Sequence, residues 1–125
     1  MDMVTARTAM VIVVDFDGTL TLNDSYPGIG ELNVPMIQLM IDLQDRGDTV
    51  ILSTARENDI LWAALDALRE HGFILDFVNN NADHRITKYN NDCRKVCGDV
   101  VIDDKSIGYT GDVDEYRRVL LCLAV

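Results

Sequence analysis

Short apolar runs alternate with amphipathic segments along the chain. Residues 10–14 form a continuous apolar run, which is typical of a strand buried on both faces of a parallel sheet. Three further apolar runs predict strands at residues 49–53, 73–78 and 100–102. Between the strands, apolar residues at helical spacing predict two helices, which start at Asn33 and Asn58 and stop at Gly47 and Gly72.

The remaining segments have weaker patterns. Residues 20–33 are rich in glycine and asparagine and predict a loop, residues 84–97 predict one short helix, and residues 113–123 predict an amphipathic helix. Strands that alternate with helices imply βαβ units with right-handed crossovers. We therefore expect an α/β protein with a Rossmann-like three-layer fold, a central and mainly parallel sheet, and a single domain over residues 1–125.

Composition narrows the class of partner. The chain has 125 residues, a net charge of −10 and a pI near 4.3, which argues against nucleic acid or an anionic membrane as a partner. The sequence has no signal-peptide pattern and no apolar stretch of transmembrane length, and its three cysteines have no disulfide-framework spacing. We therefore expect a cytoplasmic protein. A small phosphorylated substrate is also anionic, so its binding would require a cation.

Polar residues follow three of the predicted strands. These pairs are Asp15 with Asp17, Ser53 with Thr54, and Asp103 with Asp104. In open parallel sheets, ligands bind beyond the carboxyl ends of the strands. The coincidence of three polar pairs at such ends predicts a functional site there.

The aspartates suggest phosphoryl-transfer chemistry. Asp15 as a carboxylate can attack phosphorus, and Asp17 can protonate the leaving oxygen and later activate water. The tight turn at Gly18 lets Asp17 point back over the site. Repulsion among these acidic groups requires a counter-charge, and Mg²⁺ prefers oxygen ligands. The predicted metal-binding residues are Asp15, Asp17, Asp103 and Asp104.

Several residues are candidates for contact with a phosphate group. Thr54 can donate a hydrogen bond to a non-bridging oxygen, and Ser53 takes this place if the strand ends one residue earlier. Gly18 lies beside them at the first strand end. Arg56 could guide an anionic substrate, although an exposed arginine at the start of a helix is the simpler interpretation. A lysine would neutralise charge on the nucleophile and on the transferring phosphoryl group.

These residues occur in a characteristic order along the chain. The sequence resembles the haloacid dehalogenase-like (HAD) superfamily in Asp15-Phe16-Asp17-Gly18-Thr19, Ile51-Leu52-Ser53-Thr54, Lys95, and Val101-Ile102-Asp103-Asp104. The resemblance implies that Asp15 is the nucleophile, that Asp17 is the acid and base, and that the backbone carbonyl of Asp17 binds the metal. It also implies that Thr54 binds phosphate. The lysine of the family falls best on Lys95, with Lys88 as its rival.

The gaps between the motifs are too short for an inserted cap domain. The resemblance is therefore to a small, capless branch of HAD-like hydrolases. Either the site is open enough to admit a bulky substrate, or a second subunit of a homo-oligomer covers it. We expect a Mg²⁺-dependent phosphomonoesterase that forms an aspartyl-phosphate intermediate. The alternative is a non-catalytic protein of the same fold that binds metal or phosphate, or acts as a scaffold.

Overall fold

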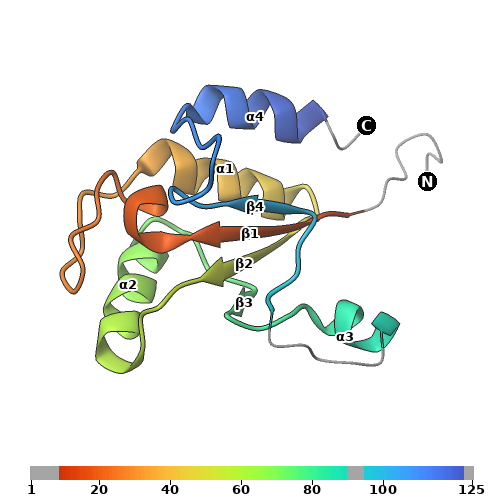
Figure 1. Cartoon of the computed structure of the whole chain (residues 1–125), viewed down its shortest axis with the longest axis horizontal. Helices are drawn as coiled ribbons and strands as arrows, with labels where there is room; N and C mark the ends of the chain where they lie inside the picture. The colour runs from red at the N-terminus through yellow and green to blue at the C-terminus, as the bar shows by residue number, and fades with distance from the viewer. Residues whose placement is uncertain (1–8, 90–94, 123–125) are drawn as a thin grey trace.

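Four parallel strands form the centre of the molecule (Figure 1). The computed structural model describes residues 9–89 and 95–122. The strands lie in the order β3-β2-β1-β4, and they are β1 (Val11–Asp15), β2 (Thr49–Ser53), β3 (Phe77–Val78) and β4 (Val100–Ile102). The helices are α1 (Val34–Asp45), α2 (Asn58–Glu70), α3 (Asp83–Tyr89) and α4 (Val113–Cys122). The predicted α/β fold with a parallel, Rossmann-like sheet is confirmed.

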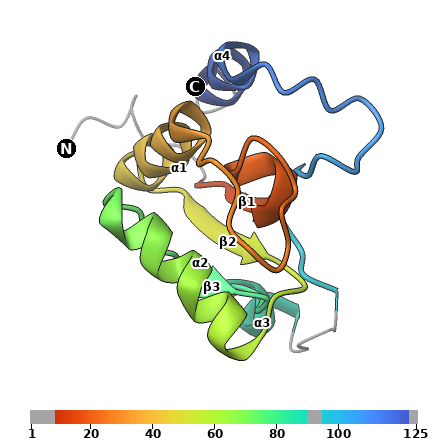
Figure 2. The ribbon, with the colours of Figure 1, turned by 90° about the vertical axis from the view of Figure 1, so that its left-hand side faces the viewer.

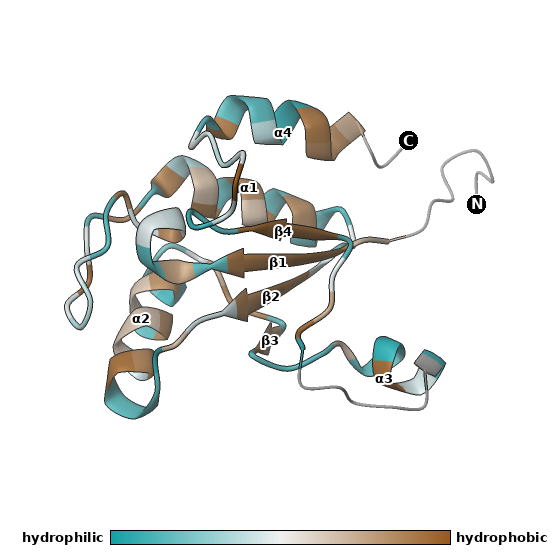
Figure 3. Ribbon diagram, in the orientation of Figure 1, coloured by the Kyte–Doolittle hydropathy of each residue, from teal (hydrophilic) through white to brown (hydrophobic). Residues whose placement is uncertain are grey.

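The strands are largely apolar, as the hydropathy colouring makes visible (Figure 3), with polar residues only at strand ends: Asp15, Thr49 and Ser53. Alternate residues of a strand point to opposite faces of the sheet. Ile12 and Val14 therefore pack with α1 and α2, while Val11 and Val13 pack on the other face with Ala82. Burial on both faces explains why the first strand has no polar alternation.

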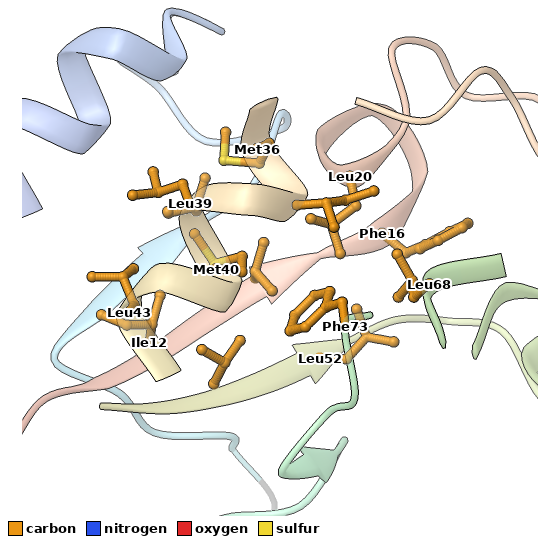
Figure 4. Close-up of a cluster of buried hydrophobic side chains, with 14 of the residues drawn as sticks. Ile12, Phe16, Leu20, Met36, Leu39, Met40, Leu43, Leu52, Leu68 and Phe73 are labelled. Carbon is orange, nitrogen blue, oxygen red and sulfur yellow. The ribbon is translucent and has the colours of Figure 1, made fainter. Parts of the chain in front are cut away.

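The larger part of the core lies between the sheet and helices α1 and α2 (Figure 4). Met36, Met40 and Leu43 of α1 are fully buried there, as are Leu68 of α2 and Phe73, which follows that helix. Burial of each such side chain contributes about 1.5–3 kcal/mol to stability. This core fixes the position of β1, and therefore of the residues at its carboxyl end.

The two long helices begin differently. Asn33 caps α1 as predicted, because its side chain accepts a hydrogen bond from the backbone N–H of Met36 at 3.4 Å. Asn58 does not cap α2. It is the first helical residue and has a φ of +51°, and the capping position belongs to Glu57, whose side chain makes no capping bond.

The last two strands differ from the prediction. The third strand is limited to Phe77–Val78, because Phe73 turns into the core directly after Gly72 and donates its N–H to the carbonyl of Leu68 at 3.0 Å. The fourth strand is not fully buried: the side chain of Val101 is 56% exposed, since β4 is the edge of the sheet. The predicted helix over residues 84–97 is the shorter α3, and residues 90–94 lie outside the described part of the chain.

The segment between β1 and α1 forms no separate cap. Phe16–Leu20 form a wide turn, closed by the N–H of Thr21, which donates to the carbonyl of Phe16 at 3.2 Å. The chain then leaves the sheet and returns where Thr21 and Leu32 pair as an isolated antiparallel bridge. We refer to residues 22–31, which lie between these two bridge residues, as the 22–31 loop. Within residues 9–89 and 95–122, none of the helices has both the length and the apolar character needed to span a membrane.

Candidate functional site

The carboxyl ends of the strands meet at one edge of the sheet, which faces the viewer in Figure 2. Asp15 pairs in register with Ser53 of β2, and Val14 pairs with Ile102 of β4. Because the strands are parallel, Asp103 follows Ile102 at the same level as Asp15. The register therefore places the three predicted polar pairs at this edge.

Three carboxylates gather at this edge. One oxygen each from Asp15, Asp103 and Asp104 lies within 4.8 Å of the others. The Oδ1 atom of Asp104 is buried and accepts no hydrogen bond within the described part of the protein. A buried carboxylate oxygen without a donor is costly, so either a shared proton or a cation is needed at this point.

Thr19 connects two of these aspartates. Its buried hydroxyl donates to Oδ2 of Asp15 at 3.3 Å and accepts the backbone N–H of Asp104 at 3.0 Å. Gly18 permits this close approach, because a Cβ atom there would collide with the carboxylate of Asp104, and because its φ of +85° is a conformation that favours glycine. The chain from Gly18 to Thr19 therefore places Asp15 against Asp104.

Burial and the acidic neighbours together raise the pKa of Asp15 from 3.8 to about 7. Burial is the largest cause, followed by the negative charges of Asp103 and Asp104, and the hydrogen bond from Thr19 acts in the opposite direction. A bound cation would reverse this effect, because an opposite charge favours the ionised carboxylate. If a cation bound here, its binding and the ionisation of Asp15 would therefore occur together.

Asp17 faces a different partner. Its two oxygens accept hydrogen bonds from Arg56, Oδ2 from Nε at 2.8 Å and Oδ1 from Nη2 at 2.6 Å. The interpretation of Arg56 as an exposed residue is wrong, since it is only 1% exposed. The side chain of Asp17 thus lies outside the cluster of three carboxylates, although it lines the same cavity.

Thr54 is held at the end of β2 by an asparagine. Asn79 accepts the backbone N–H of Thr54 at 2.8 Å and donates to its carbonyl at 2.9 Å, and the Thr54 hydroxyl accepts the N–H of Arg56 at 3.1 Å. Asn79 itself has a φ of +54°. The bidentate contact fixes the loop after β2 against the loop after β3, so that Thr54 remains at the cavity wall.

A cavity of about 270 Å³ lies above these groups. Five of its lining residues are aspartates, and the others are Tyr26, Thr54, Ala55 and Lys105. Of the candidates from the sequence, Asp15, Asp17, Thr54, Asp103 and Asp104 line this cavity. Four of the other candidates are described residues that do not line the cavity: Ser53, Arg56, Lys88 and Lys95.

Four residues of the site were not identified from the sequence. Thr19 and Asn79 are common types for a turn or a strand end, and only their three-dimensional partners reveal them. Lys105 directly follows the aspartate pair, and its Nζ lies 3.8 Å from Oδ2 of Asp104. Asp24 lines the cavity from the 22–31 loop. The position of Lys105 next to the motif was a signal that could have been used.

The fold and the site together describe an α/β protein with an all-parallel, four-stranded sheet and an acidic cavity at its carboxyl edge. The structure is similar to that of a conserved protein from Bacteroides thetaiotaomicron, with 28% sequence identity, 94% of each chain covered and a TM-score of 0.81. A comparison with models of known protein families finds no match, and a comparison with curated proteins finds none either.

Proposed function

We propose that this protein is a Mg²⁺-dependent phosphomonoesterase of the HAD superfamily. The single observation that carries the proposal is the convergence of Asp15, Asp103 and Asp104 at the carboxyl edge of the sheet, below a cavity that Asp17 and Thr54 also line. The order of these residues along the chain matches the resemblance described above. The acidic cavity favours an anionic substrate only if a cation is bound first.

The donor set fits Mg²⁺. All three converging groups are carboxylates, the ligands that hard divalent cations prefer, and the buried Oδ1 of Asp104 has no donor among the described residues. Asp15, Asp103 and Asp104 would hold the ion, together with the backbone carbonyl of Asp17 as the resemblance implies. When bound, Mg²⁺ would neutralise the cluster and polarise the phosphoryl oxygens.

The residues of the chain would then carry two steps. An oxygen of Asp15 attacks phosphorus, the bond from phosphorus to the leaving oxygen breaks, and Asp17 gives that oxygen a proton. In the second step Asp17 takes a proton from water, the water oxygen attacks phosphorus, and Asp15 and inorganic phosphate are released. Thr54 donates a hydrogen bond to a non-bridging oxygen in both steps.

The second candidate function is binding without catalysis. Both oxygens of Asp17 accept hydrogen bonds from Arg56. To protonate a leaving group, Asp17 would have to carry a proton, and one of these two hydrogen bonds would have to break. A protein that bound metal and phosphate without turnover would keep the observed ion pair throughout.

The decisive experiment compares hydrolysis of p-nitrophenyl phosphate by the wild type, Asp15→Asn and Asp24→Asn, with and without Mg²⁺. Asp24 is the matched control, because it lines the same cavity but lies outside the cluster. We expect Mg²⁺-dependent release of phosphate that Asp15→Asn reduces by several orders of magnitude and Asp24→Asn largely retains. A panel of phosphorylated metabolites would follow. Binding of Mg²⁺ with no turnover of any substrate would favour the non-catalytic function.

A further inference from the structure

The guanidinium of Arg56 is buried between three parts of the protein: the turn after β1, the 22–31 loop and the first turn of α2. It lies over the ring of Phe16 at 5.0 Å and over the ring of Tyr26 at 5.3 Å, measured from Cζ to each ring centroid. A buried charge is stable only when it is paired and hydrogen-bonded. The partners of Arg56 therefore indicate what this residue holds together.

Every N–H of the guanidinium has an acceptor. An arginine has five such donors. Two are donated to Asp17, as described above, and the other three go to backbone carbonyls: Nη2 to Gly28 at 2.6 Å, and Nη1 to Pro27 at 3.2 Å and Ile60 at 3.3 Å. Contact with a substrate would require one of these bonds to break, so the geometry favours a structural link over substrate binding.

The link joins Asp17 to the 22–31 loop. Pro27 and Gly28 belong to this loop, and so does Tyr26, whose half-exposed ring lines the acidic cavity. The same ring lines an adjoining cavity of about 390 Å³. One buried side chain thus fixes the predicted acid and base together with the cavity wall formed by the loop.

We infer that Arg56 is a positioning residue, which holds the carboxyl group of Asp17 and the Tyr26 wall of the cavity as one unit. The inference rests on the proposed function for its catalytic consequence, but the mechanical link exists whether or not the protein turns over a substrate. A lysine at this position keeps the charge, yet one ammonium group with three donors cannot replace a planar group with five.

Leaving-group dependence tests the catalytic part of the inference. An alkyl phosphate has a poor leaving group and requires the proton from Asp17, whereas p-nitrophenolate leaves without one. We expect Arg56→Lys to lower kcat/KM for an alkyl phosphate about 10–100-fold more than for p-nitrophenyl phosphate. In an Asp17→Asn background, Arg56→Lys should add little to this difference, because Arg56 acts through Asp17.

Arg46→Lys is the matched control. Arg46 forms the other buried arginine–aspartate pair of the described chain, with Asp48, at the opposite end of the sheet. Its replacement should lower the melting temperature and leave the ratio between the two substrates unchanged. An equal loss on both substrates in Arg56→Lys, as in a merely destabilised protein, would overturn the catalytic part.

Amide hydrogen exchange tests the link without any turnover. The N–H of Leu22 donates to the carbonyl of Glu31 at 2.7 Å, which closes the base of the loop. We expect exchange across residues 22–31 to accelerate in Arg56→Lys and in Asp17→Asn, but not in Arg46→Lys. Unchanged exchange in both variants would overturn the inference. If the wild type had no activity but exchange were faster in these two variants, the link would stand and only the proposed function would be refuted.

Discussion

Replacing Asp15 by asparagine should stabilise the metal-free protein. The pKa of Asp15 is about 7 in the folded state against 3.8 for an ordinary aspartate. This difference would correspond to about 4 kcal/mol of destabilisation at a pH above 7, if no solvent screened the charges. Asp15 is only half-buried, so screening reduces the expected effect to roughly 1–2 kcal/mol.

The sign follows from where the proton is bound. Below pH 3.8 Asp15 is protonated in both states, and its ionisation costs nothing. Between 3.8 and about 7 the unfolded chain releases this proton while the folded state retains it, so stability falls as the pH rises. The loss is complete above about pH 7. An asparagine does not ionise, and its Nδ2 can donate to the neighbouring carboxyl group of Asp104.

The assay is urea unfolding of the wild type and Asp15→Asn, near pH 4 and near pH 8, first in EDTA and then in millimolar Mg²⁺. In EDTA the variant should be more stable near pH 8 and nearly equal near pH 4. Mg²⁺ should stabilise the wild type and have a much smaller effect on the variant, because a ligand that binds the folded state raises its stability.

Asp99→Asn provides a control of opposite sign. The backbone N–H of Val11 and the guanidinium of Arg85 lower the pKa of Asp99, so its ionised form stabilises the folded state at neutral pH and this contribution disappears as the pH falls. Asp99→Asn should therefore destabilise the protein near pH 8. If Asp15→Asn behaved in the same way in EDTA, repulsion among the carboxylates would not govern the site and the reasoning would be refuted.

Three other substitutions test individual parts of the site. Gly18→Ala should reduce Mg²⁺ affinity, measured by calorimetry, because the added Cβ would collide with Asp104. The positive φ alone should lower stability by about 1–2 kcal/mol, measured by urea unfolding. An unchanged affinity would contradict the close packing at this turn. If the charge of Lys105 neutralises the phosphate, Lys105→Gln should raise KM for p-nitrophenyl phosphate about 10-fold. A larger loss of kcat in Lys95→Gln or Lys88→Gln would instead assign phosphate neutralisation to one of the lysines predicted from the sequence. Asn79→Ala should lower kcat/KM about 10-fold, because it removes the two hydrogen bonds that hold the backbone of Thr54 at the cavity wall, and normal kinetics would contradict this.

The strands were predictable where burial on both faces produced a continuous apolar run. The segment from Val11 to Val14 is the clearest case. Residues 73–78 are also mostly apolar, apart from Asp76, but Phe73 is buried in the core at the end of α2, where Gly72 with a φ of +81° reverses the chain. Only Phe77 and Val78 remain to pair with β2. Apolar character alone cannot distinguish a core residue at a helix end from a strand residue.

The gathering of Asp15, Asp103 and Asp104 was predictable, because parallel strands end at the same edge. The contact between Asp17 and Arg56 was not, since 39 positions separate the two residues and an arginine at the start of a helix is ordinarily exposed. Single-sequence patterns report which groups lie at an edge of the sheet. They do not report which of these groups are paired with one another.

The distribution of charge across the two ends of the sheet supports a bound cation over a merely acidic surface. At the amino end, aspartates have arginine partners: buried Asp48 pairs with Arg46, and exposed Asp99 pairs with Arg85. At the carboxyl end, the buried Arg56 pairs with Asp17 and not with the cluster around Asp15. A chain that pairs its aspartates at one end could have done so at the other. Within the described residues, the exposed Lys105 near Asp104 is the cation closest to this cluster, so negative charge remains in excess there, as the proposed divalent-ion site requires.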